Sequence, residues 1–217
     1  MEDWPLARAG VTQKFGTPGE IDAEGHTRRV AVCPAPYTRP HPPVFVSGSG
    51  SPETIAFCGK HGFVPTYFTS MGAAGPLAGH YRAAAAKSGR SFAPGENQCL
   101  VCWIQIGTSK EDALARIKAY DLDIWKNFYA GMGRRAVEND DYLGSLVNSG
   151  LFVFGTAEEV RRELVAQWRV FPAEYITLIN HYAQTPKEVV IETLDRSMRA
   201  VKPALDEVIH NARRTAA

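Results

Sequence analysis

The feature that most constrains how this chain folds is the segment at residues 98–106, in which almost every side chain is apolar. It reads Gln-Cys-Leu-Val-Cys-Trp-Ile-Gln-Ile, which is typical of a β-strand. A strand with one solvent-exposed face alternates polar and apolar residues. This pattern instead predicts burial on both faces, as in strands of parallel sheets. Parallel neighbours are joined by crossover connections, usually helices. The segment therefore predicts an α/β fold.

Strand and helix signals alternate on both sides of this segment. Strands are predicted at residues 44–46, 65–69, 98–106 and 174–179. Helices are predicted at residues 52–61, 77–88, 110 to 128 or 131 with a break, 157–170 and 186–214 (one helix or two), with a small-residue loop at 71–76 and a short helix within 131–150. We expect a parallel sheet with right-handed crossovers.

These signals predict a single domain over residues 1–217, with four βα units in residues 44–205 and a tail at residues 206–217. Residues 1–43 are irregular. Within them residues 25–33 alternate enough for a strand, for which residues 19–22 offer a hairpin partner.

The first of these units carries the strongest functional signal. A short apolar strand at residues 44–46 is followed by Ser-Gly-Ser-Gly-Ser, whose backbone a ligand can approach closely. Ser51 suits the N-cap of the next helix, and Pro52 suits its first position, where a missing N–H costs nothing. A strand, a Gly/Ser turn and a helix N-terminus together predict an anion site, most often for phosphate.

The order of these residues resembles the bacterial-luciferase-like, flavin-dependent monooxygenases. The resemblance is carried by the Pro-rich residues 34–43, by Val-Phe-Val-Ser-Gly-Ser-Gly-Ser-Pro-Glu-Thr-Ile at 44–55 and by residues 58–62. A weaker match covers Phe-Gly-Thr-Ala-Glu-Glu-Val from residue 154 and the helix at 194–205. The resemblance as a whole implies that this chain corresponds to the C-terminal half of a luciferase-like (β/α)8 TIM barrel.

The resemblance also implies an activity and a cofactor site. The family would use reduced FMN from a separate flavin reductase, with O₂, to oxidise a small organic substrate, and the deazaflavin F420 is the alternative cofactor. By resemblance, Gly50, Ser51 and Thr54 hold the flavin phosphate, and Thr69 lies beside the flavin ring. The family's catalytic residues lie largely in its first half, so none is assigned here. The alternative is a non-catalytic flavin-binding or interaction protein that retains only the phosphate loop.

Half a barrel leaves two sheet edges without partners, and such edges favour association. Three arrangements would cover them. The chain forms a homodimer, it pairs with a separate N-terminal half, or residues 1–33 and 131–150 fold back over the sheet. Twofold dimers are the commonest soluble oligomers, which favours self-association.

Composition argues against several other classes. A net charge of +1 gives no electrostatic basis for binding nucleic acid or an anionic membrane. The chain has no apolar run of membrane-spanning length, and it begins with Met-Glu-Asp-Trp, which is unlike a secretion signal, so a cytoplasmic protein is expected.

The remaining reactive side chains favour structural roles. Cys99 and Cys102 have the spacing of a redox pair, but residues three apart in a strand point to opposite faces, so we expect both to be buried and unpaired. His41 is expected in a turn and His61 at a helix C-terminus, whereas His181 follows the last strand, where a ligand contact is one interpretation. No metal-binding spacing is present.

Overall fold

The computed structural model describes residues 4–5, 23–24, 26–27, 37–39, 41–47, 51–130, 137, 139–180 and 184–216. The chain divides into two compact units, residues 1–42 and 43–217. In the first unit, β1 (Trp4–Pro5) pairs antiparallel with β2 (His26–Thr27). A strand was predicted at residues 25–33, and β1 is its partner among the described residues; the predicted hairpin partner, residues 19–22, lies outside them.

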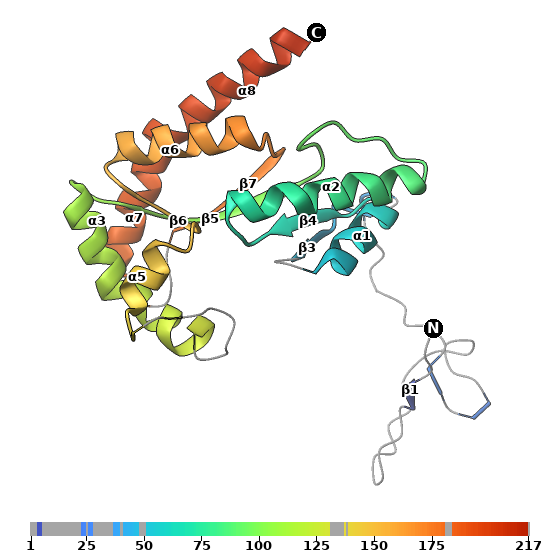
Figure 1. Cartoon of the computed structure of the whole chain (residues 1–217), viewed down its shortest axis with the longest axis horizontal. Coiled ribbons are helices and arrows are strands. Elements are labelled where there is room, and N and C mark those ends of the chain that lie inside the picture. The colour runs from blue at the N-terminus through green and yellow to red at the C-terminus, as the bar shows by residue number, and fades with distance from the viewer. Residues whose placement is uncertain are drawn as a thin grey trace. The chain divides into compact units, whose positions relative to one another are not determined.

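The second unit consists of parallel strands connected by helices (Figure 1). Its first half contains β3 (Phe45–Ser47), α1 (Pro52–His61), β4 (Val64–Tyr67), α2 (Met71–Lys87) and β5 (Cys99–Ile106). Four helical segments follow: α3 (Lys110–Arg116), the π-helix η1 (Ile117–Asp121), α4 (Leu122–Ile124) and the π-helix η2 (Trp125–Ala130). The chain continues through α5 (Tyr142–Val147), β6 (Phe152–Gly155), α6 (Ala157–Val170), β7 (Tyr175–Ile179), α7 (Lys187–Arg196), the π-helix η3 (Ser197–Val201) and α8 (Lys202–Ala216).

The predicted parallel α/β sheet is confirmed, and its register shows how the strands follow one another. β3 pairs with β4, β4 with the start of β5, and β5 with β7, all in parallel. Leu100 is paired with both β4 and β7, so these two strands lie on opposite edges of β5. The four predicted strands therefore form one continuous series, β3-β4-β5-β7.

The sheet also contains a fifth strand, β6, which the sequence analysis missed. β6 pairs with β5 from Trp103 to Ile106, past the last pairing with β4 and on the same edge. Its residues Phe-Val-Phe-Gly are too few to show a periodicity, and they run directly into the strong helix start at Thr156. They form a strand because the last residues of β5, which β4 does not reach, offer them backbone hydrogen-bond partners.

Helix α2 begins at Met71, so the prediction of a loop at residues 71–76 was wrong. Pro76 lies inside this helix and removes one backbone hydrogen bond. The early turn forms because Ala74 is fully buried and packs with Leu77 in the core, and because the backbone carbonyl of Ser70 accepts hydrogen bonds from Ala73 and Ala74. Tertiary packing therefore overrides the local preference of Gly and Pro.

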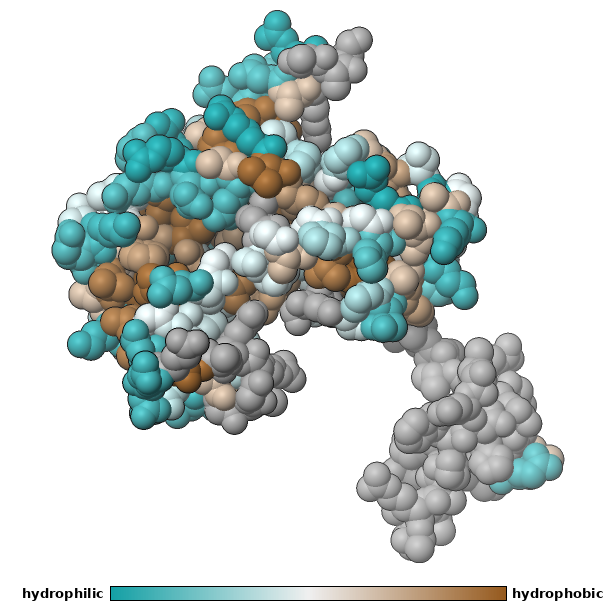
Figure 2. Space-filling view, viewed as in Figure 1, coloured by the Kyte–Doolittle hydropathy of each residue, from teal (hydrophilic) through white to brown (hydrophobic). Residues whose placement is uncertain are grey.

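The core forms three clusters around β5, whose residues are buried along its whole length, as its sequence predicts. The first joins α1 and α2 to β4, the second joins α6, η3 and α8 to β5 and β7, and the third gathers Trp103, Trp125 and Phe152. Figure 2 shows hydrophilic residues along the helices and hydrophobic ones in the spaces between α3 and α6.

The sheet is curved. The rings of Phe45 on β3 and Tyr175 on β7 approach edge to face at 5.1 Å between centroids, although two strands separate β3 from β7. Side chains of non-neighbouring strands can meet on one face only when the sheet curls around that face. Among the described residues, no helix is long and apolar enough to cross a membrane.

Candidate functional site

The parallel register brings the loops that follow the strands to one edge of the sheet. Ser47 pairs with Thr66, so the segment after β3 and residues 68–70 after β4 leave neighbouring strands on the same side. Residues 107–109 after β5 and Asn180 after β7 leave the sheet at the same edge. In open and closed α/β sheets this carboxyl edge is where ligands bind.

Ser51 caps helix α1 as its sequence predicts. Its backbone is extended, its side-chain oxygen accepts a 3.3 Å hydrogen bond from the backbone N–H of Thr54, and Pro52 holds the first helical position. Ser51 is exposed and Thr54 is half-buried. A helix N-terminus with two hydroxyl-bearing residues thus faces solvent beyond β3, as a phosphate site requires.

An acidic side chain of the protein already occupies part of this helix terminus. The Ser51 hydroxyl donates a 2.7 Å hydrogen bond to the carboxylate of Glu53. This bond, together with the backbone N–H of Glu53, holds the pKa of that carboxyl below its usual value. Glu53 therefore stays negatively charged at the place where a phosphate would bind, and an incoming phosphate has to displace it.

The other predicted cofactor residues are only partly placed. Gly50 lies outside the described residues, as does His181. Thr69 is half-buried and follows β4, at the same edge as Ser51. Ser70 next to it is the N-cap residue of α2, but its side chain makes no capping hydrogen bond. Gly150, with φ of +72°, lies so close to Ser70 that an added Cβ would come within 2.9 Å of the serine Cβ.

An aromatic cluster lies beside Thr69. The Phe68 ring meets Trp103 edge to face at 4.7 Å, and Trp103 stacks on Phe152 at 4.9 Å. Trp103 and Trp125 are almost completely buried, which confirms them as core residues. Phe128, in contrast, is 45% exposed in η2.

A buried polar pair was not found from the sequence. The side-chain amide of Gln105 on β5 donates a 3.3 Å hydrogen bond to the carboxylate of Asp121, and both residues are almost fully buried. Asp121 ends the π-helix η1, and single π-helical turns often mark functional positions. The signal available in the sequence was a glutamine in an otherwise apolar strand.

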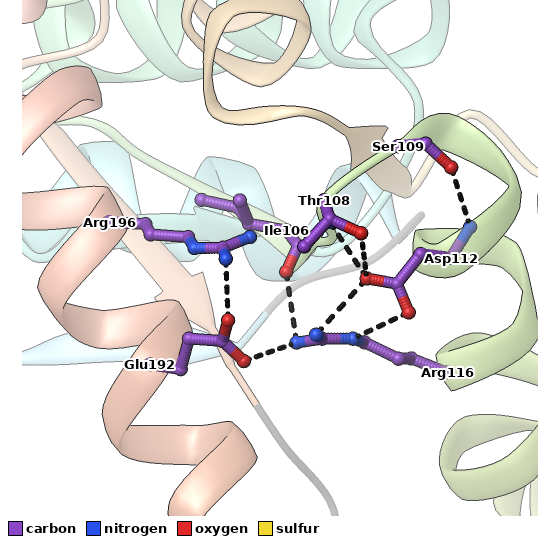
Figure 3. Close-up of polar contacts among 7 residues, drawn as sticks. All are labelled: Ile106, Thr108, Ser109, Asp112, Arg116, Glu192 and Arg196. Carbon is purple, nitrogen blue, oxygen red and sulfur yellow. Dashed lines mark hydrogen bonds and ion pairs between the residues drawn. The ribbon is translucent and has the colours of Figure 1, made fainter.

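A chain of charged groups orders the loop after β5 (Figure 3). The Asp112 carboxylate accepts hydrogen bonds from the backbone N–H of Thr108 at 2.7 Å and from its hydroxyl at 3.0 Å, and it pairs with Arg116. Arg116 donates further to the Ile106 carbonyl and to Glu192 of α7, at 3.2 and 2.9 Å. The network therefore ties the carboxyl end of β5 to both α3 and α7.

The cysteines lie as predicted. Cys99 and Cys102 are buried and unpaired, with Cys99 near the Thr177 hydroxyl and Cys102 near the Gln167 side chain. Burial raises the pKa of Cys102 to about 12, so its thiol is not poised to react. In the described part of the chain, no group of three His, Cys, Asp or Glu residues could hold a metal ion.

Ser51 does not line either of the two hollows described next. A groove of about 700 Å³ runs between α1 and α2, lined by small residues of both helices and by larger ones such as Phe57 and Lys60. A hollow of about 320 Å³ lies between η2 and Gln184, whose side-chain amide donates a 3.3 Å hydrogen bond to Asp123.

The fold is shared with several solved flavin-related proteins, although no protein-family model and no curated protein sequence matches the chain. Monooxygenase RslO1 of Streptomyces bottropensis matches with a TM-score of 0.60 at 18% identity, over 77% of this chain and 49% of the other. The oxygenating component of 3,6-diketocamphane monooxygenase from Pseudomonas putida, solved with FMN, matches with a TM-score of 0.54 at 17% identity, over 74% and 47%.

A third structure, described as flavoprotein 390, matches with a TM-score of 0.54 at 14% identity, over 87% of this chain and 76% of its own. These likenesses show the luciferase-like TIM-barrel fold. The chain spans about half the length of the two monooxygenases.

Proposed function

We propose that this protein is a flavin-dependent oxidoreductase of the luciferase-like monooxygenase type, or a half-barrel member of it. It would use reduced FMN, supplied by a flavin reductase, and O₂ on a small organic substrate. The observation that carries this proposal is the Ser51-capped N-terminus of α1 at the carboxyl edge of a sheet with the monooxygenase fold. F420 is the alternative cofactor.

The residues at this edge fit a flavin phosphate. The hydroxyls of Ser51 and Thr54 and the N-terminal dipole of α1 would bind it, with Gly50 allowing close approach and Thr69 beside the ring. Reduced flavin supplies the electrons for O₂ activation when it is bound. The protein's own part is to hold and orient the flavin, with the negative charge of Glu53 moved aside.

A second candidate is a non-catalytic flavin-binding protein. The observation in its favour is that the chain covers most of flavoprotein 390 but only about half of each monooxygenase. Retained binding without turnover is then expected, because a reactive oxygen species needs an enclosed, dry site.

The binding proposal is tested by titrating the protein with FMN and following the quenching of flavin fluorescence. Ser51→Asp should abolish binding, because it places a negative charge beside the phosphate, while far-UV circular dichroism stays unchanged. Ser91→Asp is the control, since Ser91 is exposed in the loop that enters β5, at the opposite edge of the sheet, and it should leave FMN affinity unchanged. Equal FMN affinity in wild type and Ser51→Asp would show that the site is wrongly assigned.

A substitution at Glu53 should raise the affinity for FMN, whereas Ser51→Asp should abolish binding. Glu53→Gln should tighten FMN binding several-fold, because the competing carboxylate at the helix N-terminus loses its charge. Glu111→Gln is the control, since Glu111 bonds to Ser109 at α3 as Glu53 bonds to Ser51 at α1. Weaker binding in Glu53→Gln would contradict displacement of this carboxylate by the phosphate.

Turnover separates the two candidates. The protein is supplied with FMN, NADH and a flavin reductase, and O₂ consumption is followed in the presence of aldehydes, alkanes or sulfonates. Substrate-dependent oxidation supports the monooxygenase, whereas FMN binding without substrate-dependent oxidation supports the binding protein.

A further inference from the structure

The series β3-β4-β5-β7 has a free edge at each end, while the short strand β6 lies beside the far end of β5. Among the described residues, β3 pairs with β4 alone and β7 pairs with β5 alone. A free edge presents a row of unpaired N–H and C=O groups that can accept another strand.

Exposed apolar side chains gather on the same two ends. Phe45 lies on β3 and Phe57 on α1, the helix that follows it, and Phe57 is 49% exposed. Ile191, Leu194 and Met198, which are 54%, 42% and 57% exposed, lie on α7 and η3, which follow β7. Elsewhere in the described part of this unit, the large exposed apolar residues are Phe128 and Val170. The apolar surface therefore marks the outermost strand–helix units rather than the whole molecule.

The apolar side of α7 is separate from the side that contacts α3. Ile191, Leu194 and Met198 follow helical spacing and form one stripe. Glu192 and Arg196 form another, which Arg116 ties to α3 (Figure 3). The charged stripe is thus satisfied within the chain, and the apolar stripe is available to a partner.

The exposed ring on α1 is held in place. Phe57 packs against His61 at 4.5 Å and against Phe63 at 5.9 Å between ring centroids. A rigid exposed aromatic ring in the middle of a helix is typical of an interface anchor.

We propose that a second copy of this chain covers both ends, with β3 of one copy beside β7 of the other and α1 beside α7. Phe57, in the middle of α1, would then pack on Ile191 and Leu194 of α7. One twofold rotation makes this contact twice and covers the free edges of both β3 and β7.

The extent of the structural matches agrees with this arrangement, since the chain supplies about half of a fold that the monooxygenases complete in one chain. The proposal does not depend on flavin binding.

The first test is molar mass by light scattering over a range of protein concentrations. The wild type should show the mass of two chains. Leu194→Lys and Phe57→Lys should each halve that mass with unchanged far-UV circular dichroism, because each places a charge in the same contact. Val170→Lys is the control, since Val170 is 78% exposed at the end of α6, away from both ends of the sheet, and it should leave the dimer intact.

The second test identifies which surfaces meet. In a Cys33→Ser background, Phe57→Cys combined with Leu194→Cys should form covalent dimers on oxidation, and neither single variant should. A one-chain mass for the wild type would overturn the proposal, leaving a different polypeptide as the cover. Efficient cross-linking of the Leu194→Cys variant alone would also overturn it, because α7 would then meet α7.

Discussion

At the scale of single residues, Asp112 shows how one carboxylate organises the loop after β5. Hydrogen bonds from the Thr108 backbone N–H, and then from Arg116 and the Thr108 hydroxyl, hold the pKa of Asp112 below its usual value of 3.8. A carboxyl with a lowered pKa contributes stability above its unfolded-state pKa, and this contribution is lost as the pH falls through the folded-state value. The charged network should therefore weaken below about pH 4.

We expect Asp112→Asn to lower the free energy of unfolding at pH 7 by about 1 kcal/mol, since the carboxylate is partly exposed and solvent screens its pair with Arg116. The loss of stability between pH 5 and pH 3 should be smaller than in wild type. Urea denaturation at both pH values measures this. Asp195→Asn is the control, because its pair with Arg199 is well exposed. If both variants keep the wild-type acid dependence, Asp112 is not the titrating group.

At the scale of elements, α1 and α2 lie side by side because Gly59 lets their backbones meet (Figure 1). A Cβ at Gly59 would lie 2.5 Å from the Tyr81 carbonyl oxygen and 2.9 Å from Ala84 Cβ. Backbone atoms cannot move aside as a flexible side chain can. Gly79 is also helical, but a Cβ added there would meet no neighbouring atom within 4 Å.

Gly59→Ala should therefore lower the free energy of unfolding by about 1–3 kcal/mol, as overpacking does. Gly79→Ala should raise it by about 0.5–1 kcal/mol, because alanine favours the helix and meets no obstacle. Thermal and chemical denaturation of both variants measures the difference. Equal effects of the two substitutions would show that the α1–α2 contact is looser than described.

At the scale of the whole molecule, the second unit contains its own core. Among the described residues, all members of the three hydrophobic clusters lie within residues 43–217. A chain that starts at Pro43 should therefore melt cooperatively at the midpoint of the full chain, as followed by circular dichroism or calorimetry. A clearly lower midpoint would instead favour the arrangement in which residues 1–33 fold back over the sheet.

Predictions succeeded where a feature depends on residues close in the sequence, and they failed where it depends on residues far along the chain. The bounds of α1 and α6 were predicted from residues within a few positions, such as Ser51 with Pro52, and the structure adds a capping box of Thr156 with Glu159 at α6. The uninterrupted apolar character of residues 98–106 was enough to predict a parallel sheet. In contrast, β6 and the early start of α2 depend on partners far along the chain, the end of β5 and the buried site of Ala74.

The sequence by itself determined the class of fold, the capped helix at Ser51 and the burial of Cys99 and Cys102, because each follows from neighbouring residues and side-chain period. Only the tertiary structure decided that Glu53 accepts a hydrogen bond from the Ser51 hydroxyl and that Gln105 donates one to Asp121. The ion pairs of Arg116 with Asp112 and Glu192 were likewise decided only there. Glu53 could have turned to solvent, and the other two contacts bridge separate elements. No local pattern specifies such choices, since they are made when the whole chain packs.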